Sequence, residues 1–421
     1  GGECNLSDIY DPLKLSEFRK LFLNKRALIV GAGAVGVAAT EFLIKMCMSV
    51  DLLDFDRFDE KNAAKHSCLV RTPEDVGKNK ARAVAERAKP YLADGCTANG
   101  IDANLRLLGP EALADYDVIV CAVDNNAAKV LLNELVRRLP EERRPVVIMD
   151  GTHGEMAQSV MLDNRDFCLR CLMDESWMKD ASVRTSCTGP RVHRPGDHAE
   201  HTTTSDLASS MAAHLSCEQL RAYVSGEGAA MNKRLTYTVY PQLALDESRP
   251  LRDPGCPGCR IGPPKNLRWL RGTVLEVTLG EALEQLREAL GTDDFELMAH
   301  RLSLPGAMFT GFITDGVCHC CGEPIRVMRH EGRTSLSDLR CPDCTAKGLP
   351  AQIGERFTGE KMVYGEAELK ALTLFELGYP LGAHIDVLQR GDALDITDAC
   401  VTKTVFAFDG DHEQMHRVTR L

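Results

Sequence analysis

The stretch Arg26-Ala-Leu-Ile-Val-Gly-Ala-Gly-Ala-Val-Gly36 decides how this chain of 421 residues folds. An apolar strand runs into Gly-x-Gly-x-x-Gly at Gly31, Gly33 and Gly36, and an amphipathic helix follows to about Met46. At such a turn the first amides of the helix are unpaired, and they attract the phosphates of a nucleotide. Alone, the glycine pattern predicts a nucleotide-binding fold, of which a nicotinamide-dependent dehydrogenase is the default member.

Further strands and helices alternate after this motif. Such alternation gives a mostly parallel, doubly wound sheet with helices on both faces, so the predicted fold class is Rossmann-like α/β. The strands expected next are 50–53, 118–123 and 146–149, with helices over about 77–89 and between the last two strands. A helix over about 205–223 and strands within 235–245 are expected later.

Composition bounds the kind of protein. A chain of 421 residues predicts two or three domains. The net charge of -11 disfavours a nucleic-acid partner, because phosphate neutralisation needs a surplus of Lys and Arg. No apolar run reaches the roughly 18 residues that suit a membrane span, and the first residues do not resemble a signal peptide. We therefore expect a cytoplasmic protein.

The 17 cysteines are many for such a chain, and eight of them form four Cys-x-x-Cys pairs. Without a secretion signal this spacing is typical of zinc rather than disulfides, which places the chain in a reducing compartment. The pairs are Cys168/Cys171 with Cys256/Cys259, which predict one structural zinc, and Cys318/Cys321 with Cys341/Cys344, which predict a zinc ribbon over about 317–345. In the ribbon Cys320 is an alternative ligand to Cys321, but the sequence Cys-x-x-Cys-Gly favours Cys321.

A row of polar and cationic residues follows the second strand. Asp54 ends that strand 18 residues after Gly36, where its carboxylate can accept from a ribose hydroxyl. Binding of a dinucleotide does not require the cationic residues that follow Asp54. Binding of a triphosphate does require them, because charge develops on the α-phosphate and the pyrophosphate during adenylyl transfer. The row consists of Asp56, Asn62, Lys65, His66, Lys78 and Lys80.

Asp124 and Asn125 close a further strand at the carboxyl edge of the predicted sheet. Open α/β sheets bind their ligands at this edge. A carboxylate there suits Mg²⁺, which is commonly held by one or two carboxylates together with substrate phosphates. The two residues therefore predict a magnesium–nucleotide site.

Taken together, these motifs resemble the ThiF/MoeB/HesA superfamily, which includes the ubiquitin-activating enzymes and their bacterial relatives in sulfur-carrier metabolism. The resemblance covers about residues 10–260. It implies that Asp54 binds ribose, Lys80 the phosphates and Asp124 the Mg²⁺. The cofactor-binding residues it predicts are Gly31, Gly33, Gly36, Asp54, Asp56, Asn62, Lys78, Lys80, Asp124 and Asn125.

One motif departs from the family pattern. The usual Asn-x-x-Arg-Gln is here Asn62-Ala-Ala-Lys65-His66. Lys65 keeps the positive charge but lacks the bidentate fork of Arg. The predicted catalytic residues for adenylation are therefore Lys65, Lys80 and Asp124.

Cys187 lies in Arg-Thr-Ser-Cys-Thr-Gly, near the start of a long polar segment, about 178–204, that reads as a surface loop. The resemblance matches it to the crossover-loop position where thioester-forming members place their nucleophile. Nearby Arg184 and Arg191 would lower the pKa of the thiol, and the thiolate is the reactive form. Cys187 is therefore the predicted nucleophile.

A second region follows a Gly- and Pro-containing linker at 260–265. The adenylation domain is expected over 1–260 and an α/β domain with the zinc ribbon over 266–421. A strand over 273–279 and a helix over about 280–290 are predicted to begin this domain. The ribbon is either a docking surface for a protein partner or a metal site that stabilises a domain with a small core.

These observations predict an ATP-dependent enzyme that needs Mg²⁺ and two Zn²⁺. It would adenylate the C-terminal glycine of a ubiquitin-like protein, capture it as a thioester on Cys187 and pass it to a conjugating enzyme. By resemblance it is a homodimer, with no nucleic-acid or membrane partner, in a compact bacterial conjugation pathway that serves antiviral defence. The alternatives are a sulfur-carrier adenylyltransferase, a peptide-modifying enzyme, a zinc-ribbon scaffold with a degenerate nucleotide site, and a dehydrogenase.

Overall fold

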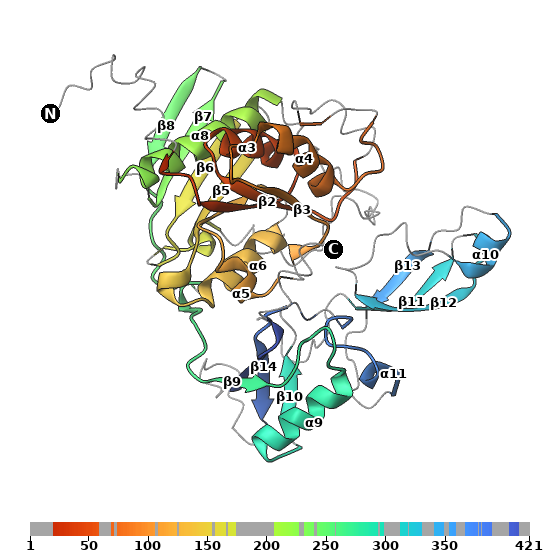
Figure 1. The fold of residues 1–421 in the computed structure, drawn as a ribbon. Helices are drawn as coiled ribbons and strands as arrows, with labels where there is room; N and C mark the ends of the chain where they lie inside the picture. Colours follow the sequence, from red (N-terminus) through yellow and green to blue (C-terminus); the bar gives the residue numbers. More distant parts are fainter. Residues whose placement is uncertain are drawn as a thin grey trace. The chain divides into compact units, whose positions relative to one another are not determined.

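The chain forms two compact units in the computed structural model (Figure 1). Unit 1 comprises Gly1–Asp102 and Ala114–Gly262, and unit 2 comprises Ala103–Leu113 and Pro263–Leu421. The structure describes residues 20–58, 69–70, 74–105, 108–123, 126–153, 156–165, 167–173, 206–226, 231–239, 242–256, 258–293, 295–298, 312–318, 320–330, 341–348, 353–358, 367–377, 379, 381–389 and 404–411.

Among the described residues, unit 1 contains an eight-stranded sheet in the order β3-β2-β1-β4-β5-β6-β7-β8. The strands from β3 to β5 pair in parallel, and β6, β7 and β8 continue the sheet in antiparallel fashion. The mostly parallel α/β sheet predicted from the sequence is confirmed. The strands are β1 (Arg26–Val30), β2 (Ser49–Leu53), β3 (Ala98–Ile101), β4 (Val118–Cys121), β5 (Val146–His153), β6 (Met156–Leu162), β7 (Lys233–Thr238) and β8 (Ala244–Ser248).

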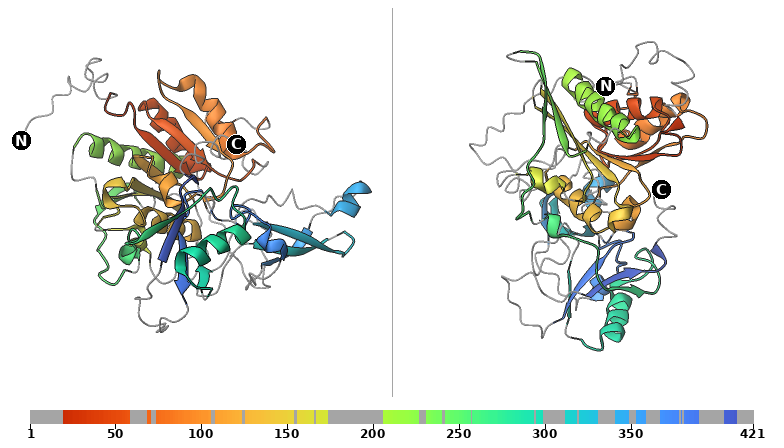
Figure 2. Two further views of the ribbon diagram at one scale, coloured as in Figure 1. Left: turned by 60° about the horizontal axis from the view of Figure 1, so that its bottom comes forward. Right: turned by 90° about the vertical axis from the view of Figure 1, so that its left-hand side faces the viewer.

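Helices cover both faces of this sheet (Figures 1 and 2). Alternate strand residues such as Ala27 and Ile29 share one buried cluster with α3, α4 and α8. Figure 1 shows α6 on the other side of the sheet from α3. Pleating sends successive side chains to opposite faces, so strands covered on both sides read as continuous apolar runs. The helices are α3 (Ala34–Lys45), α4 (Lys80–Ala88), α6 (Asn126–Arg137) and α8 (Asp206–Val224), with short 3₁₀ helices η2 (Lys89–Tyr91), η4 (Glu141–Arg143), η5 (Leu169–Leu172) and η7 (Gly258–Arg260).

Unit 2 has two smaller sheets in its described part. A four-stranded sheet has the order β10-β14-β15-β9, and a three-stranded sheet has the order β12-β11-β13. Helix α9 begins with a capping box between Thr278 and Glu281 and ends at Gly291 in the left-handed conformation. The elements are β9 (Leu267–Leu270), α9 (Leu279–Leu290), β10 (Phe295–Met298), β11 (Phe312–Cys318), β12 (Pro324–His330), α10 (Pro342–Ala346), β13 (Ile353–Thr358), α11 (Ala367–Lys370), β14 (Ile385–Gln389), β15 (Thr404–Phe408) and, from the earlier segment, α5 (Pro110–Leu113).

The strand predicted over 273–279 is wrong. Residues 274–276 form a turn, and Thr278 is already the N-cap of α9. The cause is a distant carboxylate: Asp411 accepts hydrogen bonds from Thr273 Oγ1 at 2.6 Å and from the Val274 amide at 2.8 Å. These bonds fix the backbone in a turn although its residue types favour a strand.

No helix in the described ranges combines the length and the apolar composition that crossing a bilayer requires.

Candidate nucleotide and metal sites

The glycine motif forms a tight turn between β1 and α3. Gly31 has a φ of +99°, and a Cβ at Gly36 would lie 1.9 Å from the Gly31 carbonyl oxygen. A Cβ at Gly33 would meet no described atom within 4 Å. Gly33 is also the N-cap of α3, and no described side chain caps the helix. Within the described part of the chain, no side chain occupies the position in front of the first amides of α3, as an anion-binding helix terminus requires.

Asp54 fastens the end of β2 to this turn. Its Oδ2 accepts from the Ala32 amide at 2.7 Å, and its Oδ1 accepts from the Asp56 amide at 2.8 Å. Burial raises the pKa of Asp54, the charge of Asp56 raises it further, and Lys80 opposes both effects. The carboxylate thus stands beside the glycine turn, where the sequence predicts a ribose.

Lys80 and Asp56 form an ion pair of 3.2 Å between Nζ and Oδ2, and both side chains are largely shielded from solvent. Asn79, the N-cap of α4, holds this geometry by donating to the carbonyl oxygens of Asp54 at 2.9 Å and Asp56 at 3.2 Å. The start of α4 and the end of β2 are therefore joined, so the ammonium of Lys80 is oriented by its surroundings. Lys78 differs, because it is exposed and pairs with Asp75 at 3.3 Å.

The strands that bear these residues end at one edge. β1 pairs with β2 through Val30 and Leu53 and with β4 through Val30 and Cys121. Asn62, Lys65, Asp124, Asn125 and Cys187 lie outside the described residues, so their roles stay predictions.

Asp150 is a buried carboxylate that the sequence analysis missed. It is 3% exposed, and neither oxygen has a hydrogen-bond partner within the described part of the chain. The nearby hydroxyls of Ser159 and Ser216 donate to Gln219 and to the Ala213 carbonyl. Burial raises the pKa of Asp150 to about 7, and the proximity of these two hydroxyls lowers it by less than burial raises it. The signal was available, since an acidic residue ends the apolar run Val146–Met149.

The first cysteine cluster consists of Cys168, Cys171, Cys256 and Cys259. Sulfur–sulfur distances are 3.9 Å for 168–171, 3.8 Å for 168–256, 3.5 Å for 168–259 and 3.3 Å for 171–259. A disulfide would be about 2.05 Å, whereas a tetrahedral Zn²⁺ with bonds of about 2.3 Å separates its sulfurs by about 3.8 Å. Burial raises the pKa of Cys259 to about 11, so four thiolates need a cation to form together. The cluster fits zinc.

The second cluster consists of Cys318, Cys321, Cys341 and Cys344, whose sulfurs all lie within 4.8 Å of one another. Two of these distances are 3.9 Å for 318–344 and 3.8 Å for 321–341. Cys320 is not a member. It is exposed, and its amide donates to the Cys318 sulfur at 3.4 Å. This cluster also fits zinc, with the ligands predicted from the spacing.

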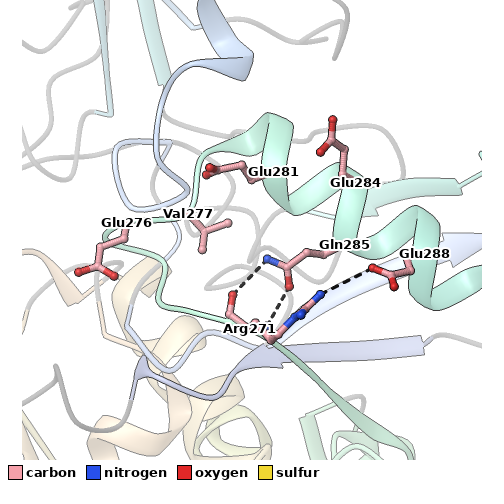
Figure 3. A pocket seen from close by; sticks show the side chains of 7 residues that line it. All are labelled: Arg271, Glu276, Val277, Glu281, Glu284, Gln285 and Glu288. Atoms are coloured by element: carbon pink, nitrogen blue, oxygen red, sulfur yellow. Dashed lines mark hydrogen bonds and ion pairs between the residues drawn. The ribbon is translucent and has the colours of Figure 1, made fainter.

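An acidic groove lies along α9 in unit 2 (Figure 3). Its volume is about 450 Å³. Gln285 links α9 to the chain after β9, because it accepts from the Arg271 amide at 2.8 Å and donates to the Arg271 carbonyl at 3.1 Å. None of the predicted site residues lines it. The lining residues are Arg271, Glu276, Val277, Glu281, Glu284, Gln285 and Glu288.

Comparison with known proteins agrees with the architecture of unit 1. The ThiF family model matches residues 11–259, which is more than half of the chain. The chain belongs to the ThiF family.

Two relatives are similar to parts of it. The SAMP-activating enzyme E1 of Haloferax volcanii is 25% identical over 246 residues, covering 57% of this chain and 82% of the relative. The sulfur carrier protein ThiS adenylyltransferase of Bacillus subtilis is 28% identical over 178 residues, covering 41% of this chain and 51% of the relative.

Among solved structures, MccB of E. coli with MccA-N7isoASN matches with a TM-score of 0.43 and 17% identity. The match covers 57% of this chain and 68% of MccB.

Proposed function

We propose that this protein is an ATP-dependent activating enzyme that adenylates the C-terminal glycine of a ubiquitin-like protein. The observation that carries the proposal is the joining of Asp54, Asp56 and Lys80 beside the open amides of the glycine turn. This arrangement combines a ribose acceptor with a cation suited to phosphate. Family membership supports the same chemistry, because the two relatives are named for activation and adenylylation of small carrier proteins.

In the first step a carboxylate oxygen of the glycine attacks the α-phosphorus of ATP. The bond from that phosphorus to the bridging oxygen breaks, and pyrophosphate leaves. The amides at the start of α3 and the ammonium of Lys80 would stabilise the charge on the phosphates. Asp124 and Asn125 would hold Mg²⁺, which supplies further positive charge, and Lys65 would add its own. Asn62 and Lys78 complete the proposed nucleotide site.

In the second step the Cys187 thiolate attacks the acyl carbon of the adenylate, and AMP leaves with the bonding electrons. The resulting thioester would pass to the cysteine of a conjugating enzyme. We propose that the enzyme works as a homodimer in the cytoplasm of a bacterium, in a conjugation pathway with a role in antiviral defence.

Sulfur transfer is the second candidate, because one relative is named for a sulfur carrier protein. There a persulfide sulfur supplied by a sulfane-sulfur donor would attack the acyl carbon of the adenylate and displace AMP. Cys187 would carry that persulfide or take no part. The two candidates share the first step and differ only in the fate of the adenylate.

The first test is ATP–pyrophosphate exchange in the presence of Mg²⁺ and small ubiquitin-like proteins that end in glycine. Lys80→Met should reduce exchange by about 10²- to 10³-fold, as removal of a transition-state donor does. Lys89→Met is the matched control, because Lys89 is exposed at the end of the same helix and pairs with Glu86. Exchange that survives Lys80→Met would remove the proposed role of this residue. Absence of exchange with every carrier would favour a non-catalytic scaffold.

The second test concerns Cys187. A gel shift that needs ATP, disappears with thiol reductant and is lost in Cys187→Ala supports the thioester. Cys96→Ala serves as a control on a partly exposed thiol that is not proposed to react. A carrier that is adenylated equally well by Cys187→Ala and forms no adduct would favour sulfur transfer.

A further inference from the structure

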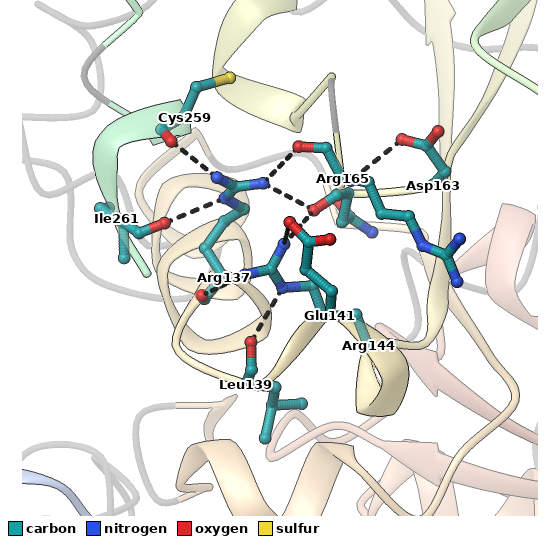
Figure 4. Close-up of polar contacts among 9 residues, drawn as sticks. Arg137, Leu139, Glu141, Arg144, Asp163, Arg165, Cys259 and Ile261 are labelled. Carbon is teal, nitrogen blue, oxygen red and sulfur yellow. Dashed lines mark hydrogen bonds and ion pairs between the residues drawn. The ribbon is translucent and has the colours of Figure 1, made fainter. Parts of the chain in front are cut away.

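Arg137 ends α6, and its side chain lies against the first cysteine cluster (Figure 4). Its Nη1 donates to the carbonyl oxygens of Asn164 and Arg165, each at 2.7 Å. Its Nη2 donates to the Cys259 carbonyl at 2.6 Å, and its Nε donates to the Ile261 carbonyl at 3.2 Å. The residue is 6% exposed. All three guanidinium nitrogens therefore bind backbone carbonyls.

These carbonyls belong to the two segments that supply the cluster. Asn164 and Arg165 precede the pair Cys168/Cys171, and Cys259 is itself a member of the second pair. Paired cysteines from the two segments are 88 residues apart in the chain. The rigid, planar fork of a guanidinium can hold several acceptors in fixed directions, which the single ammonium of Lys cannot. Arg137 therefore bridges both segments from one side.

Arg144 reinforces the bridge. It donates to the Asn164 carbonyl at 2.9 Å, to the Leu139 carbonyl at 2.9 Å and to the Arg137 carbonyl at 3.2 Å. Burial lowers the pKa of Arg144, and the charge of Arg137 lowers it further. Arg137 and Arg144 thus both donate to the Asn164 carbonyl, which lies in the segment before Cys168.

The charge of Arg137 also suits a metal-loaded cluster. Four thiolates around one Zn²⁺ leave an excess of negative charge, and buried charge is unfavourable unless it is compensated. A guanidinium bonded to the carbonyl of a ligand residue supplies that compensation next to the metal. Groups of this kind orient the ligands and retain the metal.

The remaining space around the cluster is filled closely. A Cβ at Gly258 would lie 3.0 Å from the Cys168 sulfur and 2.9 Å from Asn133 Nδ2. Asn133 is buried, and its amide has no hydrogen-bond partner among the described residues. Because both atoms lie close to the same point, the side chain of Asn133 neighbours a ligand sulfur.

We propose that Arg137 is the positioning residue that holds the two cysteine pairs together as one closed zinc site. Retention of this zinc then depends on the bridge to both segments, and the second cluster serves as an internal reference because Arg137 is not proposed to act on it.

The test is zinc release from the full chain, followed with a colorimetric chelator at a temperature where circular dichroism shows the protein folded. Arg137→Met should release one of the two ions about tenfold faster or more, as loss of groups that support metal ligands does. The other ion should leave at the wild-type rate. In Cys341→Ser the second cluster loses a ligand, so the zinc that this variant still releases at the wild-type rate belongs to the first cluster.

Two further variants keep the test decisive. Arg137→Lys preserves charge and most of the volume but cannot reach both segments, so it should fall between wild type and Arg137→Met. Arg252→Met, at an exposed position shortly before Cys256, should leave both rates unchanged. Equal acceleration of both ions, or wild-type release in both Arg137→Met and Arg137→Lys, would overturn the proposal.

Discussion

The two cysteine clusters have the same ligands but different surroundings. The first joins segments 88 residues apart. Cys171 packs against a buried apolar cluster of five residues, and Arg137 and Arg144 both donate to the Asn164 carbonyl in the segment before Cys168. The second joins segments 20 to 26 residues apart, and its buried cluster holds only three of its own cysteines, with Ile325 packed against them, among the described residues. Among the described residues, zinc would therefore fasten an apolar cluster that already exists in unit 1, whereas beside the three-stranded sheet the cysteines themselves make up the buried cluster.

The largest expected effect follows from removing zinc from the second cluster. Cys341→Ser or Cys344→Ser should unfold the sheet β12-β11-β13, because structural zinc supplies about 10 kcal/mol or more of folding free energy in domains without a core. Hydrogen exchange should show β11 and β12 unprotected while β1 and β4 remain protected. Persistent protection in β11 would show that this sheet folds without metal, and the contrast between the clusters would disappear.

The second prediction concerns the core of unit 1. The pKa of Asp150 is about 7 in the folded state and about 3.9 in an unfolded chain. Between these values the folded state binds more protons, so stability falls as pH rises from about 4 to 7 and then levels off. The accumulated loss at pH 8 is on the order of 4 kcal/mol.

Asp150→Asn should remove this loss. Guanidinium unfolding of unit 1 at pH 8 with zinc present should show a gain of a few kcal/mol, and the gain should shrink as the pH approaches 5. Asp246→Asn, at an exposed position in β8, is the control. A gain that does not change with pH would assign the effect to packing rather than ionisation.

Substitution of the glycines in the two clusters should destabilise the protein for different reasons. Gly258→Ala places a Cβ 2.7 Å from the Arg170 Cβ and 3.0 Å from the Cys168 sulfur, which should destabilise unit 1 by about 1–3 kcal/mol. Gly262→Ala meets no described atom within 4 Å and is the control. Gly322→Ala in the second cluster has space, but its φ of +74° makes a side chain unfavourable by about 1 kcal/mol. Thermal unfolding monitored separately in the two units tests all three variants.

The smallest effect is expected at Cys320. Since its sulfur lies outside the group of four that are within 4.8 Å of one another, Cys320→Ser should leave zinc affinity within about twofold of wild type. Cys321→Ser should lose the metal. Zinc stoichiometry by mass spectrometry under native conditions distinguishes them, and loss of zinc from Cys320→Ser would reassign the ligand.

The features predicted correctly from the sequence are those that depend on short spacings between residues. The glycine turn, the strand that ends at Asp54 and the four Cys-x-x-Cys pairs follow from local patterns, because each depends on residues close together in the chain. Asp150 and Arg137 were missed, since their importance comes from burial and from partners that only the folded chain brings near. The wrong strand at 273–279 has the same cause, because Asp411 lies more than a hundred residues away in sequence.

Helix α6 connects the first cluster to the end of strand β4. It begins at Asn126, shortly after β4 ends at Cys121, and it ends at Arg137 on the carbonyls around the metal ligands. A helix of this length spans about 18 Å and bends little. Chelation of the first cluster should therefore shift the far end of α6 and weaken nucleotide binding at the magnesium site that we propose, although no cysteine of the cluster is proposed to contact the nucleotide. Metal supply in the cell would then set how much of the enzyme is competent to bind its substrate.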